Sequence, residues 1–380
     1  GGVELELLGT VPLVASGGPL EMDVQLRAAR VAELLELFGQ ELPLEEPLAL
    51  DAHLTVEGGG IEIGELRAEV AGSSVRGRGS VELGGERPRV EGELQTERLA
   101  LEAWLDLADR TADGERVLAE SEGPGLREWQ EIEVAPFLAW LGLVDGRLAV
   151  EVDEVTGLDL VGLDPELREL GGTLVVEGGR GEVELSGSAM DSPIVASASA
   201  SADSNEGLRV EIESGPIALA QWLPAIEAVE PDDRLSSLRF QGSTTGATLG
   251  EWAQRLDAEL SARGVRLARQ LGGDLPVWTV EDGSIDLRQR AGQRLEVDAT
   301  ARSNGETLTV RAATASIASL LAGGELPIEL SLDGPELGAR VEGATTIGDG
   351  VAAADLELSA SLDRLSAVAP WTGISLAIST

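Results

Sequence analysis

The chain lacks several residue types on which much protein chemistry depends. Its 380 residues include no cysteine, no lysine, no tyrosine and a single histidine, and aromatic residues make up only 3%. Without cysteine there are no disulfides, no thiolate nucleophile and no cysteine-ligated zinc. The one histidine, His53, alternates in step with Asp51 and Thr55 on the polar side of its segment. We therefore expect His53 to be solvated and to have neither a catalytic nor a metal-binding role.

Sequence motifs of the common enzyme classes are also missing. Despite 48 glycines, the chain contains no Walker loop, no dinucleotide-binding G-x-G-x-x-G and no G-x-S-x-G nucleophile elbow. Carboxylates recur at every second strand position, which is typical of a solvated face and does not indicate a glycosidase pair. The acidic turn at residues 230–233 lacks the spacing and the glycine of a calcium loop. The sequence thus predicts a protein that is not an enzyme and needs no metal or cofactor.

Acidic residues far outnumber basic ones. There are 68 of them against 28 arginines, which gives a formal net charge of −40 at pH 7. Such a charge repels polyanions, so we expect no nucleic-acid partner and no attraction to an anionic membrane surface. No apolar run approaches the length of about 20 residues that spans a bilayer, and no signal peptide is recognised. Because the first residue is not methionine and residues 376–380 read as an interrupted strand, we expect a segment of a longer protein.

Apolar and polar residues alternate strictly along many short stretches. In the first of them, Leu5 and Leu7 alternate with Glu4 and Glu6. Strict alternation predicts strands with one apolar face and one wet face, the pattern of antiparallel sheets. Glycine-rich turns separate the runs as hairpins require, and roughly two dozen strands are predicted. The expected fold class is therefore mainly β.

Short apolar stretches at helical spacing interrupt the strands. Three of them end at related sequences, Gly39–Pro43, Gly272–Pro276 and Gly323–Pro327, in which glycine can end a helix and proline prevents its continuation. The stretches recur at intervals near 50 to 70 residues, roughly the period of stacked repeat proteins. We expect short helices that begin at apolar anchors, namely Val31, Leu99, Leu158, Ile217, Val265, Ile317 and Leu365.

Two arrangements would satisfy the apolar faces of so many strands. Either two sheets pack into sandwiches with a filled core, or one long curved sheet lines a groove with its apolar face. The aliphatic interior favours the groove, because a large filled β-core usually contains more aromatic rings, although biased composition would explain their scarcity equally well. The predicted lining residues of the groove are Leu148, Val150, Val152, Val210, Ile212, Leu295, Val297, Ile328, Leu330, Leu332, Leu356 and Leu358.

One polar stretch divides the chain. Residues 106–125 are acidic and without period, which is typical of a linker. The predicted organisation is a β-repeat segment at residues 1–105, the linker, and a second β-repeat segment at residues 126–380. The second segment opens with an aromatic stretch at residues 126–143, predicted to be an amphipathic helical or extended piece. Hydrophobic packing is the preferred role of this stretch, and a lipid gate or partner-docking element is the alternative.

Several parts of the sequence resemble the repeats of AsmA-family envelope proteins. Near the C-terminus these are residues 312–332, where a helix-like stretch runs through Gly-Gly-Glu-Leu-Pro into an alternating strand, and residues 354–367. Near the N-terminus they are residues 22–54 and 64–77, and residues 144–148 after the acidic linker are similar as well. The resemblance covers nearly the whole chain. The N-terminal membrane anchor that such proteins normally carry is not part of this sequence.

The resemblance implies a periplasmic β-groove, anchored to the inner membrane of Gram-negative bacteria, that carries phospholipid for outer-membrane biogenesis. The expected partners are phospholipid acyl chains, the inner membrane through an anchor outside this segment, and other envelope proteins. A second hypothesis is a scaffold that assists the assembly of outer-membrane proteins by offering edge strands for pairing. A third is an adhesin-like, filled structural β-array.

Overall fold

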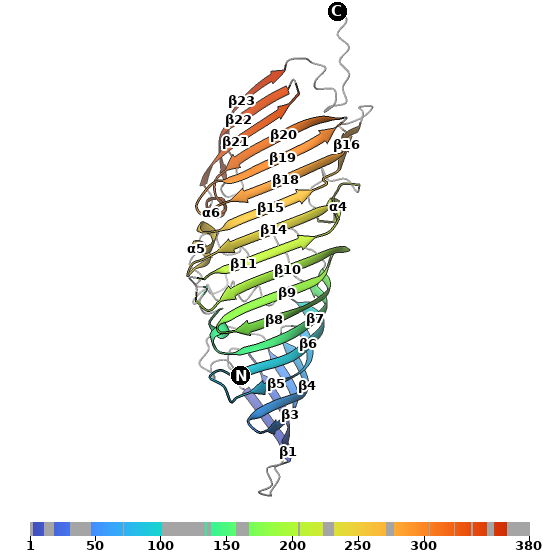
Figure 1. The fold of residues 1–380 in the computed structure, drawn as a ribbon, viewed down its shortest axis with the longest axis vertical. Helices are drawn as coiled ribbons and strands as arrows, with labels where there is room; N and C mark the ends of the chain where they lie inside the picture. The colour runs from blue at the N-terminus through green and yellow to red at the C-terminus, as the bar shows by residue number, and fades with distance from the viewer. Residues whose placement is uncertain are drawn as a thin grey trace, which may run out of the picture. The chain divides into compact units, whose positions relative to one another are not determined.

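The computed structural model consists mainly of β-strands, as the alternating sequence predicts (Figure 1). It describes residues 3–10, 19–30, 47–70, 72–100, 134, 138–156, 167–203, 206–222, 232–270, 277–303, 305–322, 324–335, 337–347 and 353–362. These residues contain twenty-three strands and a few short helices. Nineteen of the strands belong to one hydrogen-bonded sheet, and the other four form two-stranded pairs. The predicted fold class, a long and mostly antiparallel sheet with short helices, is confirmed.

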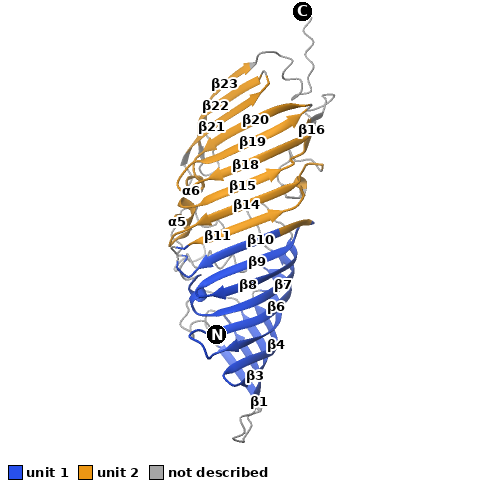
Figure 2. Cartoon of the chain, in the orientation of Figure 1, with its two compact units in different colours: residues 1–124, 134–191, 195–206 blue, residues 125–133, 192–194, 207–380 orange. Residues whose placement is uncertain are grey.

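The chain divides into two compact units (Figure 2). Unit 1 comprises residues 1–124, 134–191 and 195–206, and unit 2 comprises residues 125–133, 192–194 and 207–380. The predicted linker at residues 106–125 and most of the aromatic stretch at 126–143 lie outside the described residues. From that stretch, Val134 and Leu141 are buried, whereas Trp140 is 43% exposed.

Unit 1 is a series of neighbouring strands joined mostly by hairpins. Each strand pairs with the next one along the chain from β1 to β9, and the strands turn progressively between β9 and β3 (Figure 2, blue). The elements are β1 (Val3–Thr10), β2 (Leu20–Ala28), β3 (Leu48–Glu57), β4 (Gly60–Val70), β5 (Ser73–Glu82), β6 (Arg89–Ala100), the 3-10 helix η2 (Ala139–Gly142), β7 (Asp145–Thr156), β8 (Leu167–Glu177), β9 (Arg180–Ala189) and most of β10 (Ser192–Ser201).

One pair in unit 1 departs from the antiparallel rule. Strands β6 and β7 are parallel, in register from Arg89 opposite Asp145 to Ala100 opposite Thr156. Parallel neighbours need a long crossover connection, and residues 101–144 provide it. The strands before and after the predicted linker are therefore direct neighbours in one compact unit.

Unit 2 continues the hairpin pattern with additional elements at the ends of its strands. Antiparallel pairing runs through β11, β14, β15, β18 and then β19 to β23 in chain order. The elements are β11 (Leu208–Ser214), β12 (Ile217–Ala218), α4 (Leu219–Trp222), β13 (Arg234–Leu235), β14 (Ser237–Thr244), α5 (Leu249–Gln254), β15 (Asp257–Arg263), β16 (Leu267–Gln270), β17 (Val277–Val280), β18 (Asp282–Gln289), β19 (Leu295–Ser303), β20 (Glu306–Thr314), α6 (Ile317–Ala322), β21 (Gly324–Gly334), β22 (Leu337–Ile347) and β23 (Ala353–Leu362).

The predicted helix starts have mixed outcomes. Helix α6 begins at Ile317 and gives way to β21 at Gly324, and α4 follows Ile217 by two residues. The prediction at Val265 is wrong, because the next residues form β16 of a small hairpin whose second strand is rich in β-branched and aromatic side chains. Leu99 lies inside strand β6. The anchors Val31, Leu158 and Leu365 lie outside the described residues.

Candidate functional site

The strand register gathers the apolar residues of unit 2 on one face of its sheet. Directly opposed residues of neighbouring strands point to the same face, so a row can be followed from strand to strand. The row through the middle of nine strands is apolar at every position. It consists of Ile212, Phe240, Leu260, Leu287, Val297, Ala312, Leu330, Val341 and Leu358.

No second layer within the described residues buries this middle row. Seven of its residues are half-buried, and its two end members, Ile212 and Leu358, are 37% and 70% exposed. In a filled sandwich core, by contrast, the residues at the centre of the face are the most buried. The predicted lining residues of unit 2 share this environment, with Leu356 exposed and Val210, Leu295, Val297, Ile328, Leu330 and Leu332 half-buried.

Helices α5 and α6 lie at one end of the strands (Figure 1), and we call them the helical rim. Beneath them Ala258 and Gln289, both on the apolar face, are buried. The Gln289 side chain donates to the carbonyl oxygen of Leu256 at 3.3 Å and accepts from the backbone N–H of Ile317 at 2.6 Å. Helix α5 is itself capped by Thr248, whose hydroxyl accepts from the N–H of Glu251. Buried polar contacts thus fix the helical rim to the apolar face of the sheet.

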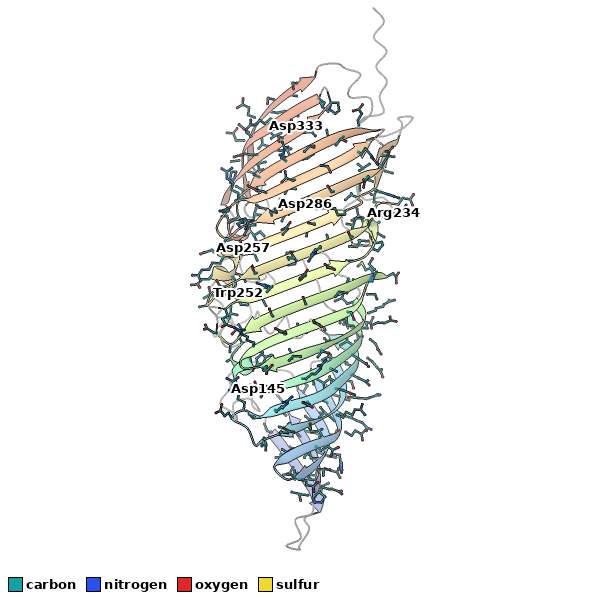
Figure 3. All side chains as sticks on the ribbon, viewed as in Figure 1. Asp145, Arg234, Trp252, Asp257, Asp286 and Asp333 are labelled. Atoms are coloured by element: carbon teal, nitrogen blue, oxygen red, sulfur yellow. The ribbon has the colours of Figure 1, made fainter. Side chains whose placement is uncertain are left out.

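The opposite end of the strands carries a second covering, which we call the hairpin rim. It consists of β12, α4, β13, β16 and β17, of which α4 and β16 are labelled in Figure 1. Its core contains Ile217, Leu235 and Val265, which pack with Ala262 of the apolar face. The Asp233 carboxylate accepts from the N–H of Ala268 at 3.0 Å and joins the two pieces of the rim. Figure 3 shows Trp252 and Asp257 at one end of the strands and Arg234 at the other.

The two rims flank part of the middle row, which we call the floor: the helical rim lies at strands β14 to β21 and the hairpin rim at strands β11 to β19. Along β15 the buried residues are Ala258 and Ala262, four positions apart, so the floor between the rims is about 14 Å wide. Nine strands at a spacing of about 4.8 Å give the floor a length of roughly 38 Å. Along β15 and β18 the covering is therefore strongest at the two strand ends and weakest in the centre, the reverse of a packed core.

Unit 1 has an apolar face of the same kind, with glycine at several positions. One row consists of Leu7, Val24, Ala52, Leu66, Gly77, Leu94, Val150, Gly172 and Leu185. The glycines allow close approach of neighbouring strands: a Cβ on Gly172 would lie 2.1 Å from the carbonyl oxygen of Glu184. Of the predicted lining residues here, Leu148 and Val150 are half-buried and Val152 is buried.

The opposite face of both units is polar and carries ion pairs between neighbouring strands. Arg263 donates to Asp286 at 2.6 Å, and Arg239 pairs with Glu211 and with Glu213. The hydrogen bond from Arg263 lowers the pKa of Asp286, and hydrogen bonds from Gln241 and then Arg239 lower the pKa of Glu211. These contacts offset some of the repulsion that the net charge of −40 creates.

The prediction that His53 is solvated is confirmed. Its side chain is 48% exposed on the polar face, and its Nδ1 lies 2.7 Å from a carboxylate oxygen of Asp23. This hydrogen bond raises the pKa of His53. His53 therefore lies on the opposite face from Ala52 of the apolar row and contributes to the ion pairs of the polar face.

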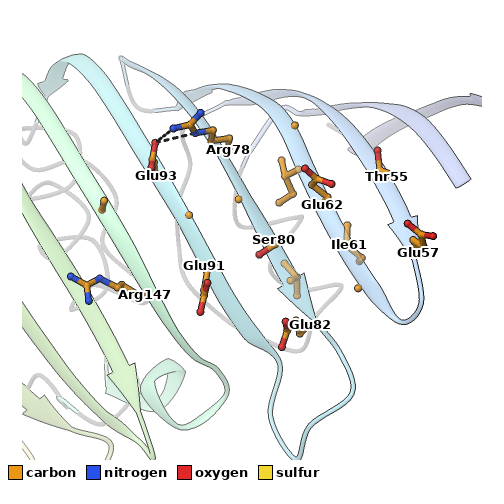
Figure 4. Close-up of a pocket in the computed structure, with 17 residues that line it drawn as sticks. Thr55, Glu57, Ile61, Glu62, Arg78, Ser80, Glu82, Glu91, Glu93 and Arg147 are labelled. Carbon is orange, nitrogen blue, oxygen red and sulfur yellow. Dashed lines mark hydrogen bonds and ion pairs between the residues drawn. The ribbon is translucent and has the colours of Figure 1, made fainter. Parts of the chain in front are cut away.

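A hollow on the polar face of unit 1 is a further candidate site (Figure 4). Its volume is about 940 Å³, and Arg78, Arg147, Glu62 and Glu91 are among the residues that line it. Arg78 is paired with Glu93 at 2.7 Å and faces solvent. Within the described ranges no group of three or more histidine or acidic side chains is arranged to hold a metal ion. The hollow therefore offers an open, ion-paired surface and not a shaped pocket.

Comparisons with known proteins add no relative. Neither a protein-family model, nor a curated protein, nor a solved structure matches the chain. In the part of the chain that the structure describes, none of the helices has the length and apolarity needed to cross a bilayer.

Sequence reasoning missed part of the groove floor. Phe240, Leu260, Leu287, Ala312 and Val341 belong to the middle row but were not among the predicted lining residues. Their strands contain serine, threonine, glycine or alanine beside the larger apolar residues, which weakens the alternation. The strand register would have identified them. Each of these residues lies directly opposite a predicted lining residue, or opposite a residue that is itself next to one in the row.

Proposed function

We propose that the chain holds the acyl chains of phospholipids in the apolar groove and lets them move along it. The observation that carries this proposal is the middle row of unit 2, which is apolar on nine successive strands, half-buried or exposed at every position, and flanked by packed rims over part of its length. Exposed apolar surface of this extent is typical of a binding site. A long, narrow and uniformly aliphatic floor suits a hydrocarbon chain better than it suits a compact ligand.

The energetics favour retention of lipid without a specific polar site. Burying about ten methylenes of an acyl chain gains roughly 8 kcal/mol. The gain is similar at each point of a uniform floor, so a chain can move from strand to strand without a large barrier. The polar head group remains in water outside the groove, where no dedicated partner is required.

The cellular setting follows from the resemblance to AsmA-family repeats at residues 312–332 and 354–367. We place the protein in the periplasm, anchored to the inner membrane by a segment outside this chain, where it supplies phospholipid for outer-membrane biogenesis. The scaffold hypothesis and the filled β-array remain alternatives. Both predict that the purified protein carries no lipid.

A single acidic substitution on the floor tests the proposal. Leu330 lies on the middle row between Ala312 and Val341, and the adjacent Ser331 points to the polar face between Arg311 and Arg340. Leu330→Asp should interrupt the aliphatic path, and Ser331→Asp introduces the same acid in the same strand beside two arginines. We expect native mass spectrometry to find fewer co-purifying phospholipids for Leu330→Asp and an unchanged number for Ser331→Asp.

Thermal unfolding provides the second measurement. Leu330 is only half-buried, so a charge there can reach water and should lower the melting temperature by only a few degrees. An unmodified protein without lipid, together with outright unfolding of Leu330→Asp, would mean a filled core and would remove the basis of the proposal.

A further inference from the structure

Phe240 differs from every other residue of the middle row. It is the row's one aromatic side chain, and it lies between Ile212 of β11 and Leu260 of β15. The other eight members are aliphatic. A ring at this point would be the largest obstacle to an acyl chain on the floor if it stood upright over the row.

The ring of Phe240 lies along its own strand, over the backbone of Gly242. A Cβ added to Gly242 would be 2.9 Å from Cζ and 3.1 Å from Cε1 of Phe240, and 3.9 Å from Cδ1 of Leu256. The ring therefore points from the middle row toward the helical rim, where Leu256 precedes β15. In this position it leaves the centre of the groove above β14 free.

The missing side chain at Gly242 makes this position of the ring possible. The φ of Gly242 lies outside the left-handed region, so its backbone would accept an L-residue without strain. The residues opposite Gly242, Val210 and Ala258, are on the same face, and Ala258 is buried. What glycine provides here is room for the ring of Phe240.

We propose that Phe240 determines whether acyl chains pass across strand β14, and that the space over Gly242 holds its ring out of their path. This proposal rests on the proposed function, since it concerns lipid in the same groove. A methyl group on Gly242 would displace the ring, and the remaining staggered χ1 positions direct it away from the strand backbone and into the groove. The aromatic ring would then narrow the groove at one strand without changing its chemistry.

Three variants and one control separate the possibilities. Gly242→Ala should displace the ring, Phe240→Ala removes it, and the double variant removes the ring that the new methyl group would displace. Gly171→Ala is the matched control, because a Cβ on this strand glycine meets nothing within 4 Å. The measurement is the rate at which each protein extracts a fluorescent-acyl phosphatidylethanolamine from phosphatidylethanolamine vesicles, with the number of bound lipids counted by native mass spectrometry.

We expect Gly242→Ala to slow extraction several-fold, the double variant to match Phe240→Ala, and Gly171→Ala to match the unmodified protein. If the unmodified protein extracts lipid and Gly242→Ala does so equally fast, or if removing the ring fails to rescue it, the assignment of Phe240 is wrong and the groove proposal stands. If the unmodified protein extracts no lipid, both proposals fail together. Should Gly242→Ala not fold, Phe240→Trp decides, because an indole is larger than the ring that the space over Gly242 holds: slower extraction than by Phe240→Ala supports the assignment, and an equal rate overturns it.

Discussion

The side-chain oxygen of Gln289 accepts a hydrogen bond from the backbone N–H of Ile317 at 2.6 Å. Gln289 lies on the apolar face of β18, and Ile317 is the first residue of α6, 28 positions later in the chain. The same amide donates to the carbonyl oxygen of Leu256, just before β15. One buried polar side chain thus connects the floor of the groove to both parts of the helical rim.

Replacing Gln289 with leucine should weaken this connection. The substitution leaves the N–H of Ile317 and the carbonyl of Leu256 without their partner in a buried position, which costs about 1–3 kcal/mol. The measurement is the free energy of unfolding from denaturant titration. The control is Gln293→Leu, an exposed position in the next turn, where a change within about 0.5 kcal/mol is expected. Equal effects of the two substitutions would contradict the role assigned to Gln289.

Gly146→Ala should destabilise unit 1. Gly146 pairs with Val90 in the parallel contact of β6 with β7, and a Cβ there would lie 1.9 Å from the carbonyl oxygen of Val90. Because the obstacle is backbone, the strands must separate, and we expect a loss of about 1–3 kcal/mol. The control Gly171→Ala places its Cβ in open space and should change stability little. An unaffected melting temperature for Gly146→Ala would show that the two strands are less closely packed.

The Arg263–Asp286 pair should give stability a dependence on acid. The pKa of Asp286 is lowered in the folded chain, chiefly by its hydrogen bond from Arg263. The pair therefore stabilises the folded state fully above the pKa of the unfolded carboxyl, and this contribution disappears as pH falls through the folded pKa. Asp286→Asn should therefore cost up to about 1 kcal/mol at neutral pH and progressively less in acid. Denaturant titrations at several pH values check this, with Asp282→Asn, an exposed acid of the same strand, as control. A difference that persists unchanged at low pH would contradict the ion pair as its source.

Limited proteolysis tests the predicted linker. Because residues 106–125 lack an apolar period, we expect the first cleavage there. Strands β6 and β7 on either side are paired over their length, so the two fragments should stay together in size-exclusion chromatography and separate only in denaturant. Early cleavage elsewhere would contradict the linker, and immediate separation of the fragments would contradict the pairing.

The period-two runs were sufficient to predict the strands, their apolar face and the solvated side of His53. Other features depend on contacts that no local pattern records. Strand β6 alternates like any antiparallel strand, so its parallel partner β7 could not be recognised. The β16–β17 hairpin was mistaken for a helix because Val265 precedes apolar residues at helical spacing. Helix α5 was missed although Thr248 and Glu251 form a recognisable capping pair.

The antiparallel register of unit 2 also constrains how such a chain can change in length. Strand direction alternates, so removing one strand would exchange the two ends of every later strand and move helix α6 to the opposite side of the groove. Removing a whole hairpin, such as β21 with β22, preserves direction and would bring Ala312 opposite Leu358 in the same row. Groove length can therefore be gained or lost only in steps of two strands, and each step changes the length by about 10 Å. Insertions and deletions in related chains should accordingly comprise complete hairpins.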